Sequence, residues 1–416
     1  MDRLSTGYAG RRWPLFLLAL KSGLLTVLTL GFYRFWMKTR LRRYYWSAIR
    51  PGGLPLEYVG EPLEKLLGFL VAVVFMAFYL GIVNLVLMFF SFSLFQTNMA
   101  GYALSFVGVL PVLFFARYRA RRYILARTRW RGIRFGLEPG AWGYAWRAAL
   151  WWLVALASLG ILWPLKAFKL EKYRTDHTYF GSERFEQGGR WTMLLRAMRP
   201  LYLAVGASAL VGGLAWWRQE AGWLWAWGVT LPWALWALAA WQARAFKALS
   251  ETKRLGGISF AAEPRPGPIL GVYLGGYLLA VLVIGVVLVG VGVVIGLLSA
   301  SGVDIDLGAL MQGDVRGMPG WLGVMLVAVG YFAVFLLWNG LTQVFVTLPL
   351  ARHFAGSVSI GPAHELAHVR QRARDEFAEA EGFADALDVG AALGAGGLLR
   401  ITPTVRRRCR TGWRCI

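Results

Sequence analysis

Charged residues are scarce in this chain. Only 16% of its 416 residues are Asp, Glu, Lys or Arg, against about 25% in a typical soluble domain. The scarcity is concentrated in apolar windows that approach or exceed the roughly 20 residues with which a helix crosses a bilayer core. A large soluble core would instead use amphipathic helices. The clear windows are 66–95, 142–165, 201–217, 223–241, 269–300 and 321–350, and shorter candidates are 13–35 and 102–116. They predict about eight membrane segments.

Cysteine and buried acid are also scarce. The two cysteines, Cys409 and Cys415, both lie in the C-terminal tail, which excludes a disulfide framework and a four-cysteine metal site. No Asp or Glu lies well inside an apolar window, and Glu64 at the mouth of one comes nearest. Proton-coupled transporters usually depend on ionisable groups within the membrane, so this absence argues against that class. No phosphate loop, dinucleotide fingerprint or nucleophile elbow occurs in a suitable setting.

Positive charge, in contrast, is abundant. The formal net charge is +23, and the cations occupy short segments between the apolar runs. This placement favours the anionic cytoplasmic face of a membrane over nucleic acid. Many of the 21 tryptophans lie at the ends of apolar windows, as expected for side chains at the membrane–water interface. The first apolar run is followed by basic residues and not by a cleavage site, so we expect it to remain in the membrane.

One boundary between an apolar run and a cationic segment is repeated. Residues 29–36 read Thr-Leu-Gly-Phe-Tyr-Arg-Phe-Trp, and residues 158–164 read Ser-Leu-Gly-Ile-Leu-Trp-Pro. A basic segment containing tyrosine follows each, and a fainter third copy lies at 347–354. This pattern is typical of a duplicated membrane protein.

A second frame recurs after other apolar runs. Residues 117–139 and 244–264 each contain a cationic helical turn, then a threonine, then a Gly-x-x-Phe step, with weaker copies at 172–185 and 42–58. The glycine indicates a turn, and the run after it fits a strand or a membrane-surface loop. We expect the cations to contact anionic lipid or a partner protein. They are Arg40, Arg42, Arg43, Arg117, Arg119, Arg121, Arg122, Lys169 and Lys172.

Orientation follows from the basic loops. The acidic loop at 301–320 should face outward, whereas 166–199, 242–265 and the chain beyond 350 should be cytoplasmic. The arginine-rich segment 117–147 also belongs inside by this rule. A single crossing at 142–165 cannot join two cytoplasmic segments. Either that run dips in and returns, or one basic segment lies on the other side.

The sharpest catalytic match is His364-Glu365-Leu366-Ala367-His368. On a helix, HExxH places two imidazoles on one face for zinc and a glutamate to activate water. Glu379 and Glu381 lie only 11 and 13 residues past His368, which is poor spacing for a third ligand. We therefore expect an amphipathic surface helix and no cofactor, with a zinc metallopeptidase as the alternative.

The candidate polar residues within apolar windows are Lys21, which can reach the interface, and Asn84, Asn339, Thr342 and Gln343. The last three are spaced to share a helix face. Hydrogen bonding between helices explains such residues, and the alternative is the substrate path of a small-solute transporter.

The run 28–36, with Arg40 and Tyr44 after it, resembles the signature of the YjgN-like bacterial inner-membrane proteins. Residues 159–164 resemble the second occurrence of that signature, and 381–390 resemble the closing acidic motif of that family. The resemblance covers most of 13–393. It implies a multi-pass inner-membrane protein and no particular activity, and it implies an ordinary helix without a metal pair at the HExxH position.

The sequence therefore predicts an all-α polytopic transmembrane helical bundle with a degenerate internal duplication. The expected units are a first membrane repeat over 1–141, a second over 142–266, a membrane hairpin over 267–354, a cytoplasmic helix over 355–393 and a disordered basic tail over 394–416. We expect a non-enzymatic, transporter-like or scaffold protein of the bacterial inner membrane, with a cytoplasmic C-terminus. Its expected partners are membrane lipids and other membrane proteins.

Overall fold

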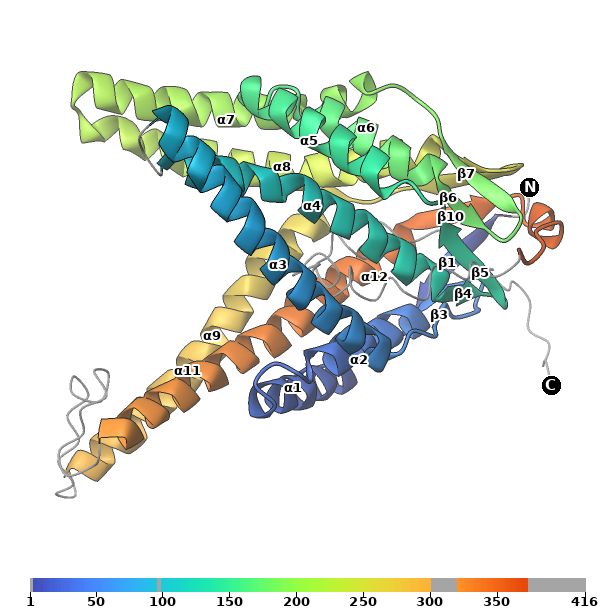
Figure 1. Cartoon of the computed structure of the whole chain (residues 1–416). Coiled ribbons are helices and arrows are strands. Elements are labelled where there is room, and N and C mark those ends of the chain that lie inside the picture. The colour runs from blue at the N-terminus through green and yellow to red at the C-terminus, as the bar shows by residue number, and fades with distance from the viewer. Residues whose placement is uncertain (1–2, 96–98, 301–319, 373–416) are drawn as a thin grey trace.

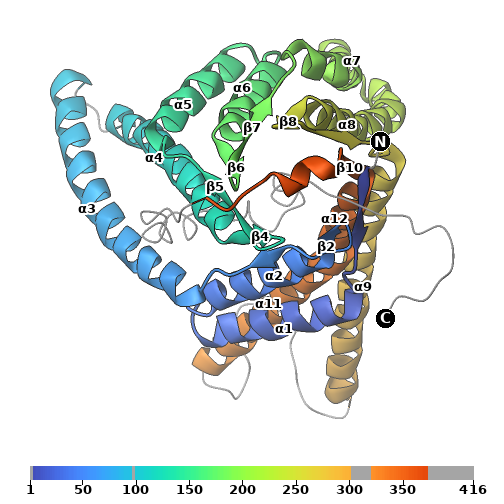
Figure 2. The same cartoon turned by 90° about the vertical axis from the view of Figure 1, so that its right-hand side faces the viewer.

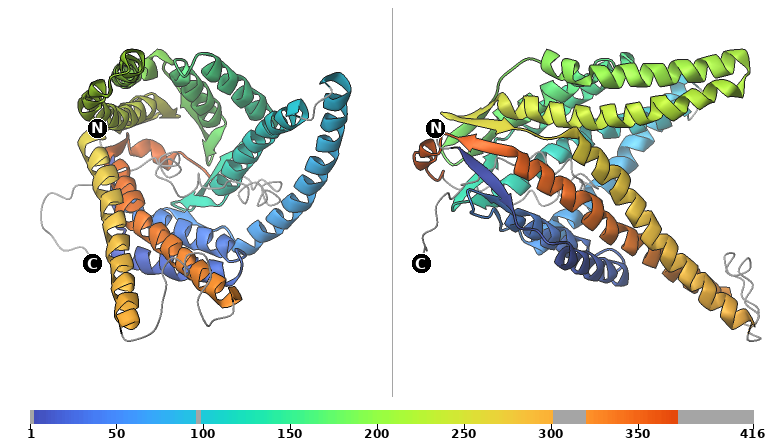
Figure 3. Two further views of the ribbon diagram at one scale, coloured as in Figure 1. Left: turned by 90° about the vertical axis from the view of Figure 1, so that its left-hand side faces the viewer. Right: turned by 180° about the vertical axis from the view of Figure 1, so that it is seen from behind.

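The computed structural model of the chain describes residues 3–95, 99–300 and 320–372. Helices spread from a small, curled β-sheet at one end of the molecule, and the long helices extend far beyond it (Figure 1). The same spread is visible from the side and from behind (Figure 3). The acidic loop around Asp304, the acidic closing motif and both cysteines lie outside the described residues.

The sheet contains ten strands in the order β2-β1-β10-β9-β8-β7-β6-β5-β4-β3, all paired antiparallel. The prediction of an all-α fold was therefore wrong. The strands are β1 (Leu4–Tyr8), β2 (Ile49–Pro51), β3 (Glu57–Tyr58), β4 (Thr128–Trp130), β5 (Ile133–Leu137), β6 (Thr178–Phe180), β7 (Glu183–Gln187), β8 (Lys253–Leu255), β9 (Ile258–Ala262) and β10 (Val358–Gly361).

These strands escape detection because none exceeds five residues, too few for a clear two-residue alternation. Three of the hairpins turn through left-handed residues, at Arg131 and Gly132, at Gly181 and at Gly256. Such turns match the twist of paired strands. The repeated Gly-x-x-Phe step is thus a hairpin turn followed by a strand, β5 in one copy and β9 in the other.

The sheet curls until its ends nearly meet. Its terminal strands, β2 and β3, are consecutive in the chain, and the Leu56 N–H donates to the Ile49 carbonyl oxygen at 3.1 Å. Strand β1 pairs with β10, with Leu4 opposite Ile360, so the first and last described strands lie side by side. Viewed toward the sheet, the helices form a ring around it (Figure 2).

Helices lead into and out of the strand hairpins in pairs. The long ones are α3 (Pro62–Phe95), α4 (Met99–Ala126), α7 (Thr192–Arg218), α8 (Trp227–Glu251), α9 (Pro266–Ala300) and α11 (Gly320–Thr342). The shorter ones are α1 (Arg12–Leu28), α2 (Arg34–Ala48), α5 (Ala141–Ala157), α6 (Trp163–Asp176) and α12 (Leu348–Ser357). A 3₁₀ segment, η1 (Ala221–Ala226), joins α7 to α8, and a π-helical turn, η2 (Gln343–Thr347), joins α11 to α12.

The core lies where the helices meet the sheet. Its members include Tyr45 of α2, Tyr118 of α4, Trp130 of β4 and Phe180 of β6. Farther from the sheet, large apolar side chains are exposed along α3, α7, α8 and α9. Apolar surface of this extent is typical of membrane or protein contact areas, because soluble monomers rarely expose apolar patches so large.

Three helical segments within the described residues are long and apolar enough to cross a membrane: Thr192–Arg218, Pro266–Val293 and Ala328–Ser357. They support membrane association. The five sequence units drawn above stay predictions. Strand β10 occupies part of the segment that the sequence predicted to be helical from residue 355.

Candidate functional site

The two copies of the small-Leu-Gly boundary form the same turn. It breaks α1 from α2 and α5 from α6, and Leu159 follows Leu30 by 129 positions (159 minus 30). The leucine and glycine are left-handed in both, with φ of 51° at Leu30, 94° at Gly31, 50° at Leu159 and 86° at Gly160. The glycine N–H donates back to the preceding helix at 2.7 Å in one copy and 2.8 Å in the other.

The small residue of the motif binds the backbone just before the second helix. The Thr29 hydroxyl oxygen accepts from the Tyr33 N–H at 2.9 Å, and the Ser158 hydroxyl oxygen accepts from the Leu162 N–H at 3.0 Å. Each bond satisfies the N–H of the residue that precedes the second helix, Tyr33 before α2 and Leu162 before α6. The motif therefore encodes a helix end, a reversal and a new helix start.

The third copy lacks this turn. Thr347 and Leu348 have helical backbone angles, so the chain continues from η2 directly into α12. Pro349 stands where the other copies have glycine. Without a residue that readily adopts the left-handed conformation, the reversal does not form.

A tyrosine ties the base of each broken hairpin. The Tyr173 hydroxyl donates to the Gly140 carbonyl oxygen at 2.9 Å, which joins the end of α6 to the start of α5. The Tyr44 hydroxyl donates to the Arg11 carbonyl oxygen at 2.5 Å and accepts from the Arg11 N–H at 2.7 Å. The run 142–165, whose topology the sequence left open, thus turns back toward the end where it began.

The tips of the two broken hairpins are apolar and bare. Leu30 is 91% exposed and Leu159 is 94% exposed, and Phe32 and Ile161 beside them are also exposed. The left-handed conformation costs a leucine roughly 1–2 kcal/mol. Strained residues persist where the structure or the function compensates for them, and no packing against the protein does so for a side chain exposed to this degree.

The opposite ends of these hairpins are cationic. We use the term cationic collar for a set of Lys and Arg residues on α2, at the start of α3, on α4 and directly after it, on α6 and at the start of β8. They are Lys38, Arg40, Arg42, Arg43, Lys65, Arg117, Arg119, Arg121, Arg122, Arg127, Lys169, Lys172, Arg174 and Lys253.

One buried cluster of the collar lies between α2, α3 and α4. Arg42 donates to the Tyr58 hydroxyl at 3.1 Å, and Lys65 donates to the Thr39 hydroxyl at 3.1 Å. The Lys65 ammonium also lies 5.1 Å from the Tyr58 ring centroid, within range of a cation–π interaction. A neighbouring ion pair, Arg127 with Glu64, closes at 2.9 Å.

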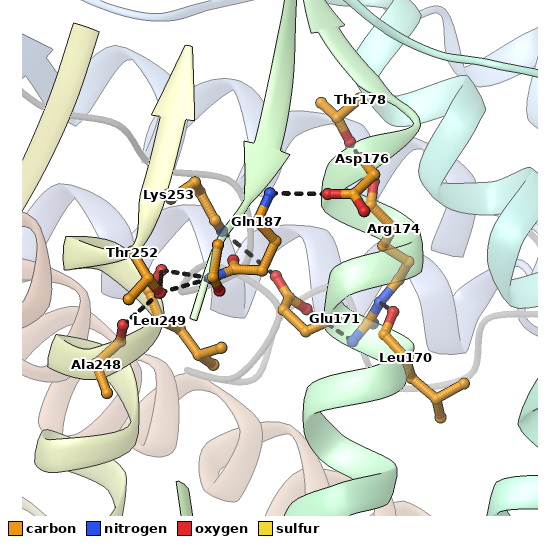
Figure 4. A network of polar contacts seen from close by, with 11 residues as sticks. Leu170, Glu171, Arg174, Asp176, Thr178, Gln187, Ala248, Leu249, Thr252 and Lys253 are labelled. Carbon is orange, nitrogen blue, oxygen red and sulfur yellow. Dashed lines mark hydrogen bonds and ion pairs between the residues drawn. The ribbon is translucent and has the colours of Figure 1, made fainter. Parts of the chain in front are cut away.

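A second cluster lies between α6, β7 and β8 (Figure 4). Glu171 accepts from Arg174 at 2.8 Å and lies 3.5 Å from the Lys253 ammonium, with the carboxylate 10% exposed. Burial lowers the pKa of Lys253, nearby Arg121 and Arg174 lower it further, and Glu171 opposes them. Gln187 completes the network by donating to Thr252 at 2.7 Å. One carboxylate therefore holds two cations in this cluster.

The sequence-predicted cations differ in burial and fall into three classes. Arg42 and Arg122 are buried, so they serve the interior of the collar. Arg40, Arg43, Arg117, Lys169 and Lys172 are exposed, and Arg119 and Arg121 are half-buried. The collar residues that the sequence analysis missed are Lys38, Lys65, Arg127, Arg174 and Lys253. The signal that points to Arg174 is its i, i+3 spacing from Glu171.

The HExxH segment does not form a regular helix. His364–Ala367 is a 3₁₀ helix, η3, in which about three residues complete a turn, so His364 and His368 do not share a face as they would one α-helical turn apart. Both histidines are exposed. Within the described residues, no three His, Cys, Asp or Glu side chains gather as a metal site. Glu379 and Glu381 lie outside them, and the zinc hypothesis stays a prediction.

Two polar residues of the apolar windows, Thr342 and Gln343, form hydrogen bonds within the protein. Thr342 donates to the Trp338 carbonyl oxygen within its own helix. Gln343, at the start of η2, accepts a 2.7 Å bond from the Tyr45 hydroxyl of α2. Asn339 is half-buried near them. The Asn84 side chain lies outside the described part of α3.

Comparison with known proteins gives one family. Neither a curated protein nor a solved structure matches the chain. A family model, described as a bacterial protein of unknown function (DUF898), matches residues 3–386. This is the family of the YjgN-like proteins, so the resemblance inferred from the sequence is confirmed. The match covers nearly the whole chain, which therefore belongs to the DUF898 family.

Proposed function

We propose that this protein is a multi-pass protein of the bacterial inner membrane that acts without catalysis, as a scaffold holding anionic phospholipid head groups at its cationic collar. The observation that carries the proposal is the opposite chemistry of the two ends of each broken hairpin. The tips expose leucine at 91% and 94%, and the bases lie within the collar. Hydrocarbon suits the first environment and lipid phosphate the second.

In this proposal the long helices cross the membrane and the two broken hairpins enter it and return. Helix α1 has 17 residues, which gives it a length of about 26 Å, short of the roughly 30 Å hydrocarbon core. Irregular backbone at membrane depth requires satisfied N–H and C=O groups. The turn bonds at Thr29 and Ser158 meet that requirement in part.

The sheet and the collar face the cytoplasm in this arrangement. Basic residues flanking membrane segments are retained on that side. The α7–α8 tip has the chemistry of an outer loop, with Arg218, Gln219 and Glu220 at its end. Exposed tryptophans surround it, among them Trp216, Trp217 and Trp225, which suits the interfacial belt.

Site-directed labelling tests the arrangement. Single cysteines at Gln219, Leu159 and the exposed Ser182 of the β6–β7 turn are introduced in a variant whose Cys409 and Cys415 are replaced by serine. We expect a membrane-impermeant maleimide to label the cysteine at 219 in intact spheroplasts and the cysteine at 182 only after permeabilisation. The cysteine at 159 should resist labelling in both. Rapid labelling at 159 from outside would show that α5 and α6 cross the membrane, which contradicts the proposal.

Native mass spectrometry tests the lipid function. The purified protein is titrated with phosphatidylglycerol and with phosphatidylcholine of the same chain length. We expect the anionic lipid to be retained preferentially, because the collar is cationic and phosphatidylcholine has no net charge. Equal retention of the two lipids would refute lipid-head-group binding, whatever the topology.

A further inference from the structure

One face of the sheet carries arginines on several strands. Residues directly opposite each other on antiparallel strands share a face, and so do alternate residues of one strand. Arg129 of β4 lies opposite Arg134 of β5. Two residues farther along β5, Gly136 lies opposite Tyr179 of β6, which in turn lies opposite Arg184 of β7. The other face of these strands is aromatic and packs into the core. We use the term arginine face for the side with Arg129, Arg134, Tyr179 and Arg184.

The chain after β10 runs toward the arginine face. Figure 2 shows this segment, in red, crossing from β10 toward β6 and β5. The Arg370 carbonyl oxygen accepts from the Ser182 N–H of the β6–β7 turn at 2.8 Å. The next side chain, Gln371, accepts from the Arg134 N–H of β5 at 2.9 Å. These two bonds direct the chain from the β6–β7 turn toward the β4–β5 hairpin.

The described residues end on the arginine face. The Arg372 guanidinium lies 4.6 Å from the Tyr179 ring centroid, within range of a cation–π interaction. Strand β4 is two strands away from β6 in the sheet, a separation of about 10 Å. Three residues of extended chain span about the same distance, so residue 375 can reach the β4–β5 hairpin.

The β4–β5 hairpin offers Arg129 and Arg131 at that position. Neither forms an ion pair with a residue that the structure describes. The Arg129 Nε is buried without a hydrogen-bond partner among them, and the exposed Arg131 guanidinium lies 5.1 Å from the Trp130 ring centroid. Glu57, opposite Arg129 on β3, is exposed. Burying a guanidinium N–H without an acceptor is unfavourable, and a carboxylate is the acceptor that suits it best.

The residues that follow the arginine face in the chain are acidic. Residues 375–388, which we call the acidic segment, hold six of the 22 Asp and Glu residues and no Lys or Arg. The six are Asp375, Glu376, Glu379, Glu381, Asp385 and Asp388. Because a short tether gives a segment a millimolar effective concentration at a nearby surface, its own chain is favoured as the partner over a free lipid or a second copy.

We infer that the acidic segment docks on the arginine face of its own chain, with its first carboxylates on Arg129 and Arg131. This inference goes beyond the proposed function, which leaves the acidic segment without a role, and it does not depend on lipid. The docking neutralises the arginines of the β4–β5 hairpin and holds the chain after β10 against the sheet.

Protection from proteolysis tests the docking in the full-length protein. Glutamyl endopeptidase cleaves after the glutamates of the acidic segment, and mass spectrometry follows the cut after Glu379 in detergent at low ionic strength. The cut after Glu220, which is exposed at the α7–α8 tip, is the internal reference. The test variant is Arg129→Gln/Arg131→Gln.

The matched control is Arg196→Gln/Arg199→Gln, which removes the same charge from two exposed positions of α7. Relative to the reference cut, we expect the test variant to be cleaved after Glu379 about tenfold faster than the wild type, the usual effect of losing a charged hydrogen bond. The control should stay within about twofold of the wild type. High salt should speed the cleavage of the wild type, because it screens exposed charges.

A charge swap separates docking from a loss of structure. Arg131 is left-handed, with φ of 53°, a conformation that aspartate adopts more readily than most residues. Arg131→Asp should therefore keep the wild-type melting temperature and speed the cleavage after Glu379. Adding Asp375→Arg should restore slow cleavage, because the two charges are exchanged.

The other outcomes overturn the inference. Equal cleavage after Glu379 in the wild type, the test variant and the control would show that these arginines do not hold the acidic segment. Protection that is lost when the protein is diluted would assign the segment to a second copy. Protection that requires added phosphatidylglycerol would assign it to the lipid. The proposed lipid function is decided separately, by the titration with phosphatidylglycerol and phosphatidylcholine.

Discussion

The broken hairpin α5–α6 and the long hairpin α7–α8 follow each other in the chain and end in opposite chemistry. The first reverses through Ser158, Leu159 and Gly160, with a bare leucine at its tip. The second reverses at Gln219, which is also left-handed, with φ of 55°, and lies between Arg218 and Glu220. The same backbone device is thus used with an apolar side chain in one hairpin and a polar one in the other.

The bases of the two hairpins differ as well. Helix α6 anchors the buried Glu171 cluster, and its Tyr173 closes the hairpin onto Gly140. The last turn of α8 reaches the same cluster, since Gln187 donates to the Leu249 carbonyl oxygen and to Thr252, but its own ion pair, Lys247 with Glu251 at 3.7 Å, is exposed. The short hairpin is held firmly at the sheet and is apolar at its tip. In the proposed arrangement, its base would therefore set how deeply the tip enters the membrane.

The largest expected effect comes from the base of the short hairpin. Glu171→Gln leaves Arg174 and Lys253 without the carboxylate they share, and the pKa of Lys253 should fall further because its favourable partner is lost. Breaking a buried ion pair from one side costs about 3–5 kcal/mol. Glu251→Gln in α8 is the control, at under about 0.5 kcal/mol for an exposed pair. Unfolding by denaturant in bicelles measures the free energy of unfolding of both variants. Equal losses for Glu171→Gln and Glu251→Gln would show that the two ion pairs do not differ in strength.

The second largest effect should come from a charge placed at the hairpin tip, which we expect to lower the free energy of unfolding at one tip and not at the other. Leu159→Lys loses almost no protein contact, since the side chain is 94% exposed. If the tip lies in hydrocarbon, a lysine there costs about 3 kcal/mol. Gln219→Lys at the other tip should change the unfolding free energy in bicelles by less than about 0.5 kcal/mol, as at a wet surface. A negligible effect at residue 159 would place that tip in water.

From the sequence, a returning segment at 142–165 was one of two alternatives left open, and the sheet was missed. Thr29 or Ser158 followed by leucine and glycine is local information, and the charge conflict at 142–165 did not decide between the alternatives. Strand pairing is not local: Leu4 lies opposite Ile360, and strands of two to five residues carry no periodic signal. The Glu171–Lys253 contact joins positions 82 apart, so the sequence does not reveal it. Within this cluster, only the i, i+3 pair of Glu171 and Arg174 on α6 could be predicted.

Tyr44 and Tyr173, which tie the bases of the two broken hairpins, should contribute smaller and unequal amounts to the free energy of unfolding. Tyr173→Phe removes one hydrogen bond, and the Gly140 carbonyl still accepts from the Tyr144 N–H. We expect a loss of about 1 kcal/mol. Tyr44→Phe removes two bonds to Arg11, so we expect about 2 kcal/mol. Tyr331→Phe, at an exposed position of α11, should be neutral in the same denaturation measurement. A larger loss at Tyr173 than at Tyr44 would contradict this ranking.

The smallest expected effect is on the free energy of unfolding when the left-handed residue of each tip is replaced by glycine, and its sign should differ between the two tips. Glycine in place of Leu159 relieves left-handed strain worth roughly 1 kcal/mol, so in water the variant would be more stable than the wild type. In hydrocarbon the same change also forfeits the transfer free energy of a leucine side chain, about 2–3 kcal/mol, and the balance reverses to a net loss of about 1 kcal/mol. Gln219→Gly relieves the same strain at the polar tip with no such apolar loss, and it should stabilise by up to about 1 kcal/mol.

Opposite signs for the two glycine variants, measured in bicelles by denaturant unfolding, would show that one left-handed turn lies in lipid and the other in water. Stabilisation by both would mean that the leucines at 30 and 159 are exposed for a reason other than membrane insertion.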